Sequence, residues 1–132
     1  MNITSELVSL AVVAVGTGLM WVPYTLARIK TRGLVATLGN PNPALAPDPQ
    51  WAQRARMAHS NAIENLAVFA PLVLILATLG VSTPATVLAA KLYVGARLVH
   101  FVVYAAGIPV IRTAAFIAGV VAMLVLAAAV YP

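Results

Sequence analysis

The sequence contains no cysteine and very little charge. Among its 132 residues, charged side chains account for 8% and hydrophobic ones for 62%, whereas a soluble domain carries about 25% and 45–50% respectively. The absence of cysteine excludes disulfides, zinc–sulfur sites and catalysis by a protein thiolate. The composition therefore excludes an ordinary soluble globule, a disordered chain and a disulfide scaffold. It predicts an integral membrane protein that forms one domain, residues 1–132.

Acidic residues are scarcer still than basic ones. Eight Lys and Arg against three Asp and Glu give a net charge of +5. In a soluble chain this charge would suggest nucleic-acid binding. Here the basic residues are few and segregated between apolar runs, so a membrane explains them better and no nucleic-acid partner is expected.

Four apolar runs are long enough to cross a bilayer, which takes about 20 helical residues. We expect spans at about 5–27, 54–80, 84–107 and 111–131, with a loop at about 28–53. The runs are too long and too uniformly apolar for barrel strands of about 10 alternating residues. The predicted fold class is therefore an all-α membrane protein with four transmembrane helices. Pro23 and Pro71 lie inside spans and are expected to kink them.

The basic residues also predict an orientation. Five of them lie between residues 28 and 56, against the single acid Asp48. Because positive loops stay in the cytoplasm, we expect this loop on the cytoplasmic side and both termini on the other side. Nothing basic precedes the first apolar run, and Glu6 lies where a signal peptide would be positive, so no signal peptide is expected. The proline-rich segment 40–49 is expected to be a surface loop.

The second predicted span begins with polar residues. At 100° per residue, Arg54, Met57, Asn61 and Glu64 share one helix face, and Asn61 and Glu64 lie one turn apart. An arginine at a helix end can simply extend to the headgroups. Glu64 lies within the length needed to cross the membrane, so that explanation does not apply to it.

The third predicted span has a polar stripe. Tyr93, Arg97, His100 and Tyr104 are spaced by four, three and four residues, so they share one face. Arg97 falls near mid-bilayer, where a charge costs at least about 2.5–3.5 kcal/mol and must face the protein interior. One structural interpretation is a buried ion pair between Arg97 and Glu64 that joins the two spans.

An Arg97–Glu64 pair would leave other cations without a partner. Arg112 begins the fourth span, and Arg54 and Arg56 begin the second, with no further acid nearby. A buried charge needs a partner, and guanidinium binds carboxylate or phosphate through two parallel hydrogen bonds. The pattern therefore predicts an anionic ligand. Lipid headgroups are an alternative for the outer arginines, although they do not explain a deep stripe.

These residues together resemble those of a known family. The motifs are an Asn-x-x-Glu pair in the second span and an Arg-x-x-His-x-x-x-Tyr stripe in the third, followed by an arginine. They resemble the MAPEG family, the membrane-associated proteins in eicosanoid and glutathione metabolism, over nearly the whole chain. The residues that carry the resemblance are Arg54, His59, Asn61, Glu64, Asn65, Phe69, Arg97, His100, Tyr104 and Arg112.

The resemblance implies a fold and a site. It implies a left-handed up-down four-helix bundle that assembles as a homotrimer, with glutathione as cosubstrate bound between subunits near the cytoplasmic side. The further expected partners are a hydrophobic small-molecule substrate and membrane lipid. By position, the resemblance implies glutathione contacts at Arg54, Asn61, Glu64, Arg97, His100 and Tyr104, a neighbouring-subunit contact from Arg28, and a catalytic role in stabilising the thiolate for Arg112.

The implied chemistry is that of a glutathione transferase or peroxidase. The thiolate is the nucleophile, and a free thiol has a pKa near about 8.5, so a cation such as Arg112 beside the sulfur would promote its ionisation. The thiolate would attack a hydrophobic electrophile or reduce a lipid hydroperoxide. One alternative is a non-catalytic member of the family, which Met57 favours because many relatives carry arginine there. Another is a small proton-coupled transporter that uses Glu64, although the surrounding arginines would repel a cationic substrate.

Overall fold

The computed structural model describes residues 2–131, and all regular secondary structure in this part of the chain is helical. The helices are α1 (Ser5–Leu19), α2 (Trp21–Arg32), α3 (Leu34–Leu38), α4 (Gln50–Thr78), α5 (Pro84–Ala106) and α6 (Pro109–Ala128). Four stretches are long and apolar enough to cross a membrane: Ser5–Arg32, Gln50–Thr78, Pro84–Ala106 and Pro109–Ala128. This confirms the predicted all-α protein with four membrane-spanning helices. Positions 1 and 132 of the predicted domain lie outside the described residues.

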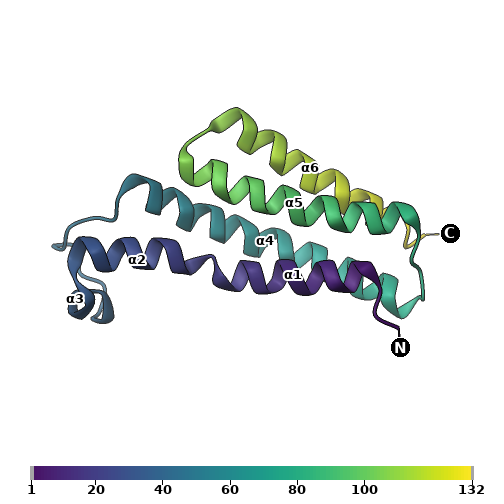
Figure 1. The fold of residues 1–132 in the computed structure, drawn as a ribbon, viewed down its shortest axis with the longest axis horizontal. Coiled ribbons are helices and arrows are strands. Elements are labelled where there is room, and N and C mark those ends of the chain that lie inside the picture. Colours follow the sequence, from purple (N-terminus) through teal and green to yellow (C-terminus); the bar gives the residue numbers. More distant parts are fainter. Residues whose placement is uncertain (1, 132) are drawn as a thin grey trace.

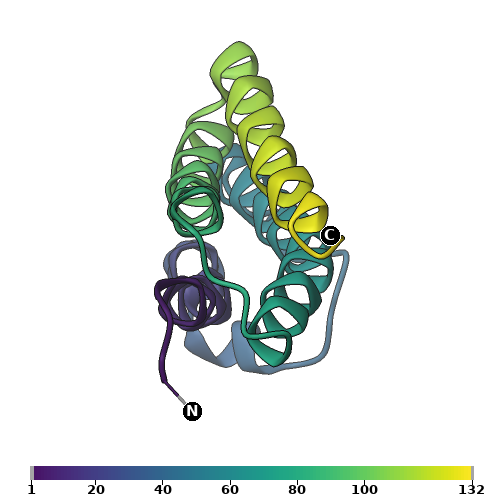
Figure 2. The same cartoon turned by 90° about the vertical axis from the view of Figure 1, so that its right-hand side faces the viewer.

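The spans lie side by side along the length of the molecule (Figure 1). Their connections alternate between the two ends, and both termini lie at the same end. Helices α4 and α5 pack on each other, and α1 and α6 each pack on both of them. The end-on view in Figure 2 shows α1 and α6 in separate positions around this central pair. We call the end opposite the termini the basic end, because α2 finishes and α4 begins there with most of the Arg and Lys residues.

The first span is interrupted where proline removes a hydrogen bond. Helix α1 ends at Leu19 and α2 begins at Trp21, with Met20 between them. Pro23 lies four residues after Leu19 and has no N–H to donate to its carbonyl, which accounts for a break at this position. Pro71 differs in its effect, since α4 continues through it without interruption.

Local capping defines both ends of α5. Thr83 and Thr86 form a reciprocal capping box at the start of α5, where Pro84 occupies the first turn. Gly107 ends α5 with φ +80, and a Cβ there would lie 3.2 Å from the Arg54 guanidinium carbon, so both conformation and space favour glycine. Helices α2, α3 and α4 extend into the segment expected as loop 28–53, which leaves Gly33 and residues 39–49 outside helices.

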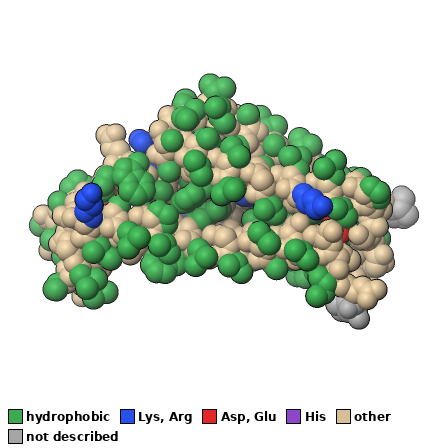
Figure 3. Space-filling model, in the orientation of Figure 1, with side chains coloured by type: hydrophobic (Ala, Val, Ile, Leu, Met, Phe, Trp, Pro, Cys, Tyr) green, Lys and Arg blue, Asp and Glu red, His purple; other side chains and the backbone are tan. Residues whose placement is uncertain are grey.

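The interior of the bundle is apolar at the end where the chain termini lie. Most of the surface is apolar as well. Phe69 of α4 stacks on Tyr93 of α5 with ring centroids 3.8 Å apart, and both are fully buried with Val73 and Leu126 in one core cluster. Apolar side chains also cover much of the face drawn in Figure 3, with few charges among them. Such a surface suits contact with lipid tails rather than with water.

Glu6 is buried, with 2% of its surface exposed. Its carboxylate accepts hydrogen bonds from Ser82 Oγ at 3.0 Å and from Thr86 Oγ1, so it joins the first span to the start of α5. Sequence reasoning used Glu6 only as an argument against a signal peptide and did not anticipate this role. No local signal indicates it, because the hydroxyl partners are about 80 residues away along the chain.

Candidate functional site

Arg97 lies at the centre of a polar cluster inside the bundle. It is 2% exposed, and its Nη2 atom donates a hydrogen bond to Asn61 Oδ1 at 2.7 Å. The same nitrogen lies 3.3 Å from His100 Nδ1. The other two guanidinium nitrogens, Nε and Nη1, are buried and have no hydrogen-bond partner within residues 2–131. The structure thus brings together three of the predicted site residues and leaves two strong donors unsatisfied.

The predicted ion pair between Arg97 and Glu64 is wrong. Within residues 2–131 the salt bridge that forms is Arg28–Asp48, and Glu64 lies on the exposed side of α4. Asn61 and Glu64 are three residues apart and therefore about 60° apart around the helix. That rotation directs Asn61 to Arg97 and Glu64 to the surface of the subunit.

An aromatic contact extends the cluster toward the start of α6. The rings of His100 and Tyr104 meet edge to face, with centroids 5.5 Å apart. The guanidinium carbon of Arg112 lies 4.6 Å from the centre of the Tyr104 ring, in a cation–π contact. His100 is 3% exposed, whereas Tyr104 and Arg112 are half-buried. The series Arg97, His100, Tyr104 and Arg112 therefore passes from the interior to an accessible position.

The remaining predicted site residues have partners of their own. Arg54 Nε donates to the carbonyl of Ala105 at 3.0 Å, which attaches the start of α4 to the end of α5. Arg28 donates hydrogen bonds from two nitrogens to the Asp48 carboxylate, and its Nη2 lies 2.6 Å from Oδ2. This hydrogen-bonded pair holds the pKa of Asp48 below its ordinary value. Within one chain Arg28 therefore pairs with Asp48 of the loop and does not join the Arg97 cluster.

An apolar groove lies beside the buried guanidinium. It has a volume of about 290 Å³ and lies between the first span and α5. Gly16, Met20 and Pro23 line it around the break in the first span, and Arg97 is its only charged lining residue. The groove thus places apolar surface next to a buried cation.

Two further aromatic residues belong to this region. The Tyr93 hydroxyl, one turn before Arg97, is buried without a hydrogen-bond partner in the described chain. Its place in the four-three-four stripe was the available sequence signal, although Tyr93 was not among the predicted site residues. Tyr24 Oη lies 2.9 Å from His59 Nδ1 and links α2 to α4, a contact that no motif indicated.

Fold and site together define a multi-pass α-helical membrane protein that holds a cationic polar cluster in its interior. The sequence model of the MAPEG family matches residues 7–131, and the chain belongs to this family. The resemblance seen in the sequence motifs is thereby confirmed. A search of curated proteins finds no match to the chain.

Proposed function

We propose that this protein is a membrane-bound glutathione transferase or peroxidase. The observation that carries the proposal is the pair of buried, unpartnered Arg97 nitrogens in a cluster where no carboxylate of residues 2–131 forms a salt bridge. A buried charge is stable only with a partner, and a guanidinium pairs best with a carboxylate through two parallel hydrogen bonds. Glutathione carries two carboxylates, one ammonium group and a thiol, so it matches this set of donors.

The contacts suggest a role for each residue. Arg97 and Asn61 would hold a glutathione carboxylate in the interior, with His100 and Tyr104 along its length. Glu64 would receive the ammonium group, since a carboxylate is the natural partner for it. Arg54 would attract the glutathione anion at the outer edge of the site.

Bound glutathione supplies the nucleophilic sulfur, and Arg112 is the catalytic residue of this proposal. A guanidinium group carries a positive charge, and a fixed cation beside a thiol favours the thiolate. In conjugation the sulfur forms a bond to an electrophilic carbon, whose leaving group departs with the bonding pair. In peroxide reduction the sulfur takes the terminal oxygen, the O–O bond breaks and the alkoxide takes a proton. A second glutathione then converts the sulfenic acid to the disulfide and water.

The apolar groove gives a hydrophobic partner a path to the cluster. A substrate dissolved in the bilayer could enter between the first span and α5, where Val12 and Leu98 line the groove and are exposed at 55% and 63%. Arg97 lines its inner wall. Apolar electrophiles and lipid hydroperoxides suit such a route, because their tails match the lining and their polar reactive groups match the cation.

Glu64 supports an oligomer. It lies 14 residues from either end of α4, Gln50–Thr78, or about 21 Å at 1.5 Å per residue, and it is exposed on the single chain. A carboxylate facing lipid at that depth is costly, so we propose that another copy covers this face in a homotrimer of left-handed bundles. Arg28 would then approach a neighbouring subunit's glutathione. The basic end would face the cytoplasm and the termini the opposite side.

The test compares Arg112→Ala with Arg112→Lys in purified, detergent-solubilised protein. We expect the parent to bind glutathione and to conjugate it to a chlorinated nitrobenzene. Arg112→Ala should bind glutathione within a few-fold of the parent but lose at least about tenfold in conjugation rate, since one pKa unit of thiol activation corresponds to about tenfold. Arg112→Lys keeps the charge and should retain part of the rate.

Three outcomes would overturn parts of the proposal. Failure of glutathione to bind the parent rejects the site. Equal conjugation by Arg112→Ala and the parent rejects the role of Arg112. Binding without turnover of any apolar electrophile or hydroperoxide identifies a non-catalytic member of the family instead.

A further inference from the structure

A second polar pocket lies at the basic end, apart from the Arg97 cluster. It has a volume of about 390 Å³ and is formed by α2, α3, α4 and the loop after α3. Arg28, Arg32 and Arg56 line one side of it, and loop residues 39–43 line the other. The pocket thus combines three cations with a short polar loop.

Within residues 2–131, two of these three cations, Arg32 and Arg56, form no salt bridge. Arg28 is neutralised by Asp48. Arg32 uses Nε to bind the carbonyl of Ala46, which leaves its charge uncompensated. Arg56 is exposed. The chain has only three acids, and the other two lie elsewhere, so the pocket keeps a net charge of about +2 and is complementary to an anion.

Helix α3 presents apolar side chains directly beside this pocket. Leu34, Val35 and Leu38 are 56%, 87% and 77% exposed, and α3 has no buried residue. Their spacing places them near one another on one side of the helix turn. Exposed leucine and valine next to arginines are typical of a segment that lies in the interface of a membrane.

The lengths of the spans place this pocket at headgroup depth. The span Ser5–Arg32 contains 28 residues and the span Gln50–Thr78 contains 29, so each reaches about 42 Å or slightly more at the helical rise. The hydrocarbon core is about 30 Å thick. In both spans, the end that lies near the chain termini is more apolar than the basic end. About 12 Å of each span therefore extends beyond the hydrocarbon at the basic end, where Arg32 and Arg56 lie.

We propose that this pocket binds the phosphate of an anionic phospholipid, with Arg32 and Arg56 contacting the phosphate and the apolar side of α3 lying against the acyl chains. The phosphate has the charge and the acceptor geometry that guanidinium groups bind. A phospholipid presents its phosphate at this depth of the bilayer together with acyl chains that can contact α3, which a soluble anion lacks. This inference does not depend on glutathione chemistry.

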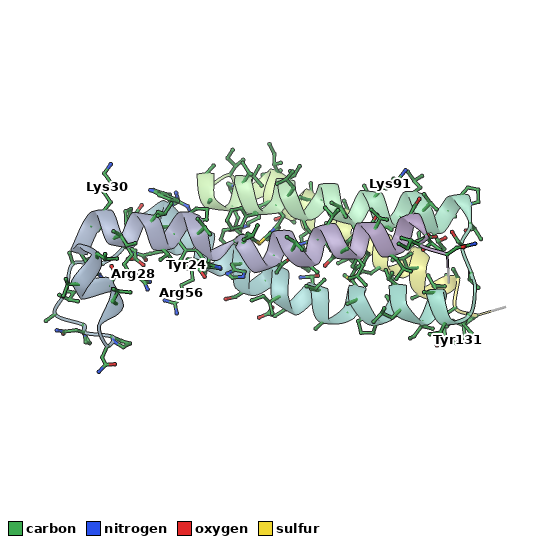
Figure 4. All side chains as sticks on the ribbon, turned by 60° about the horizontal axis from the view of Figure 1, so that its bottom comes forward. Tyr24, Arg28, Lys30, Arg56, Lys91 and Tyr131 are labelled. Carbon is green, nitrogen blue, oxygen red and sulfur yellow. The ribbon has the colours of Figure 1, made fainter. Side chains whose placement is uncertain are left out.

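The chain offers a matched control for the charge. Lys30 is exposed, lies on the same helix as Arg28, and does not line the pocket. Figure 4 shows Lys30 pointing away from the side on which Arg28 and Arg56 lie. Lys30→Gln and Arg56→Gln therefore remove the same charge at the same end of the bundle, from outside and inside the pocket respectively.

The experiment measures retained lipid by native mass spectrometry after reconstitution in phosphatidylcholine with a minor fraction of phosphatidylglycerol. We expect the parent to retain phosphatidylglycerol preferentially. Arg56→Gln should reduce this preference at least about fivefold, the double variant Arg32→Gln/Arg56→Gln should abolish it, and Lys30→Gln should leave it unchanged. Arg56→Lys, which keeps the charge, should retain more than Arg56→Gln.

Several results would overturn the proposal. An equal loss in Lys30→Gln would reduce the effect to general charge attraction, and equal losses in Arg56→Lys and Arg56→Gln would reject the electrostatic contact. Displacement of the lipid by millimolar inorganic phosphate would identify a site for a soluble anion. Val35→Ser should weaken retention, and unchanged retention would reject the contact between α3 and the lipid. In pure phosphatidylcholine, each variant is expected to unfold at the same temperature as the parent. This measurement separates a loss of lipid binding from misfolding.

Discussion

Replacement of Arg97 by methionine separates stability from ligand binding. Methionine keeps a long flexible side chain but removes the charge and every hydrogen-bond donor. In the parent, the two unpartnered nitrogens cost about 1–3 kcal/mol each. The lost hydrogen bond to Asn61 contributes about 1.5–3 kcal/mol, as for a charged group. Asn61 Oδ1 keeps a second donor, Asn65 Nδ2, at 3.3 Å.

These contributions largely offset one another. We therefore expect the free energy of unfolding of Arg97→Met to lie above that of the parent or at most about 1 kcal/mol below it. A residue in a buried ion pair behaves differently, since removal of one partner costs about 3–5 kcal/mol. The measurement is equilibrium unfolding in mixed micelles, followed by circular dichroism, with and without glutathione.

Glutathione should distinguish the two proteins. At a hundredfold excess over its dissociation constant, a ligand of the folded state stabilises it by about 2.7 kcal/mol. We expect that gain in the parent and none in Arg97→Met. Tyr93→Phe is the control, because it removes the other buried, unpartnered group while keeping the stacked ring. It should retain the response to glutathione.

Two outcomes would refute this reasoning. A loss of more than about 3 kcal/mol in Arg97→Met without ligand would show that Arg97 has a charged partner in the assembled protein. A full glutathione response in Arg97→Met would show that the ligand binds elsewhere.

Three more predictions follow from other parts of the fold. Gly16→Leu should fill the apolar groove and slow the conjugation of a large apolar electrophile several-fold. Gly18→Leu, outside the groove, should match the parent. Equal rates for the two variants in steady-state assays would exclude the groove as the route. Asp48→Asn should lower stability by about 1 kcal/mol at pH 7. Because Arg28 lowers the pKa of Asp48, this deficit should shrink as the pH falls below about 4, and a constant deficit in unfolding measurements at several pH values would contradict the pair. Glu6→Ala leaves two hydroxyl donors without their acceptor and should cost about 1–3 kcal/mol in the same unfolding assay.

Much of the polar cluster around Arg97 could be predicted because it depends on helix periodicity. Arg97 and His100 are three residues apart, and a helix of 3.6 residues per turn must place them on one face. Their burial followed from charge, since a lipid-facing arginine at that depth is too costly. Asn61 and Glu64 lie on the same face of their helix, so periodicity could not decide which of them contacts Arg97.

The sequence by itself determined the class of protein, the four spans and the polar stripe of α5, because each follows from composition or from repeats within one helix. Only the tertiary structure decided the partners: Asn61 rather than Glu64 for Arg97, Asp48 for Arg28 and Thr86 for Glu6. These contacts join residues 20 to 80 positions apart. They depend on how the helices rotate and pack against one another, which local sequence patterns do not specify.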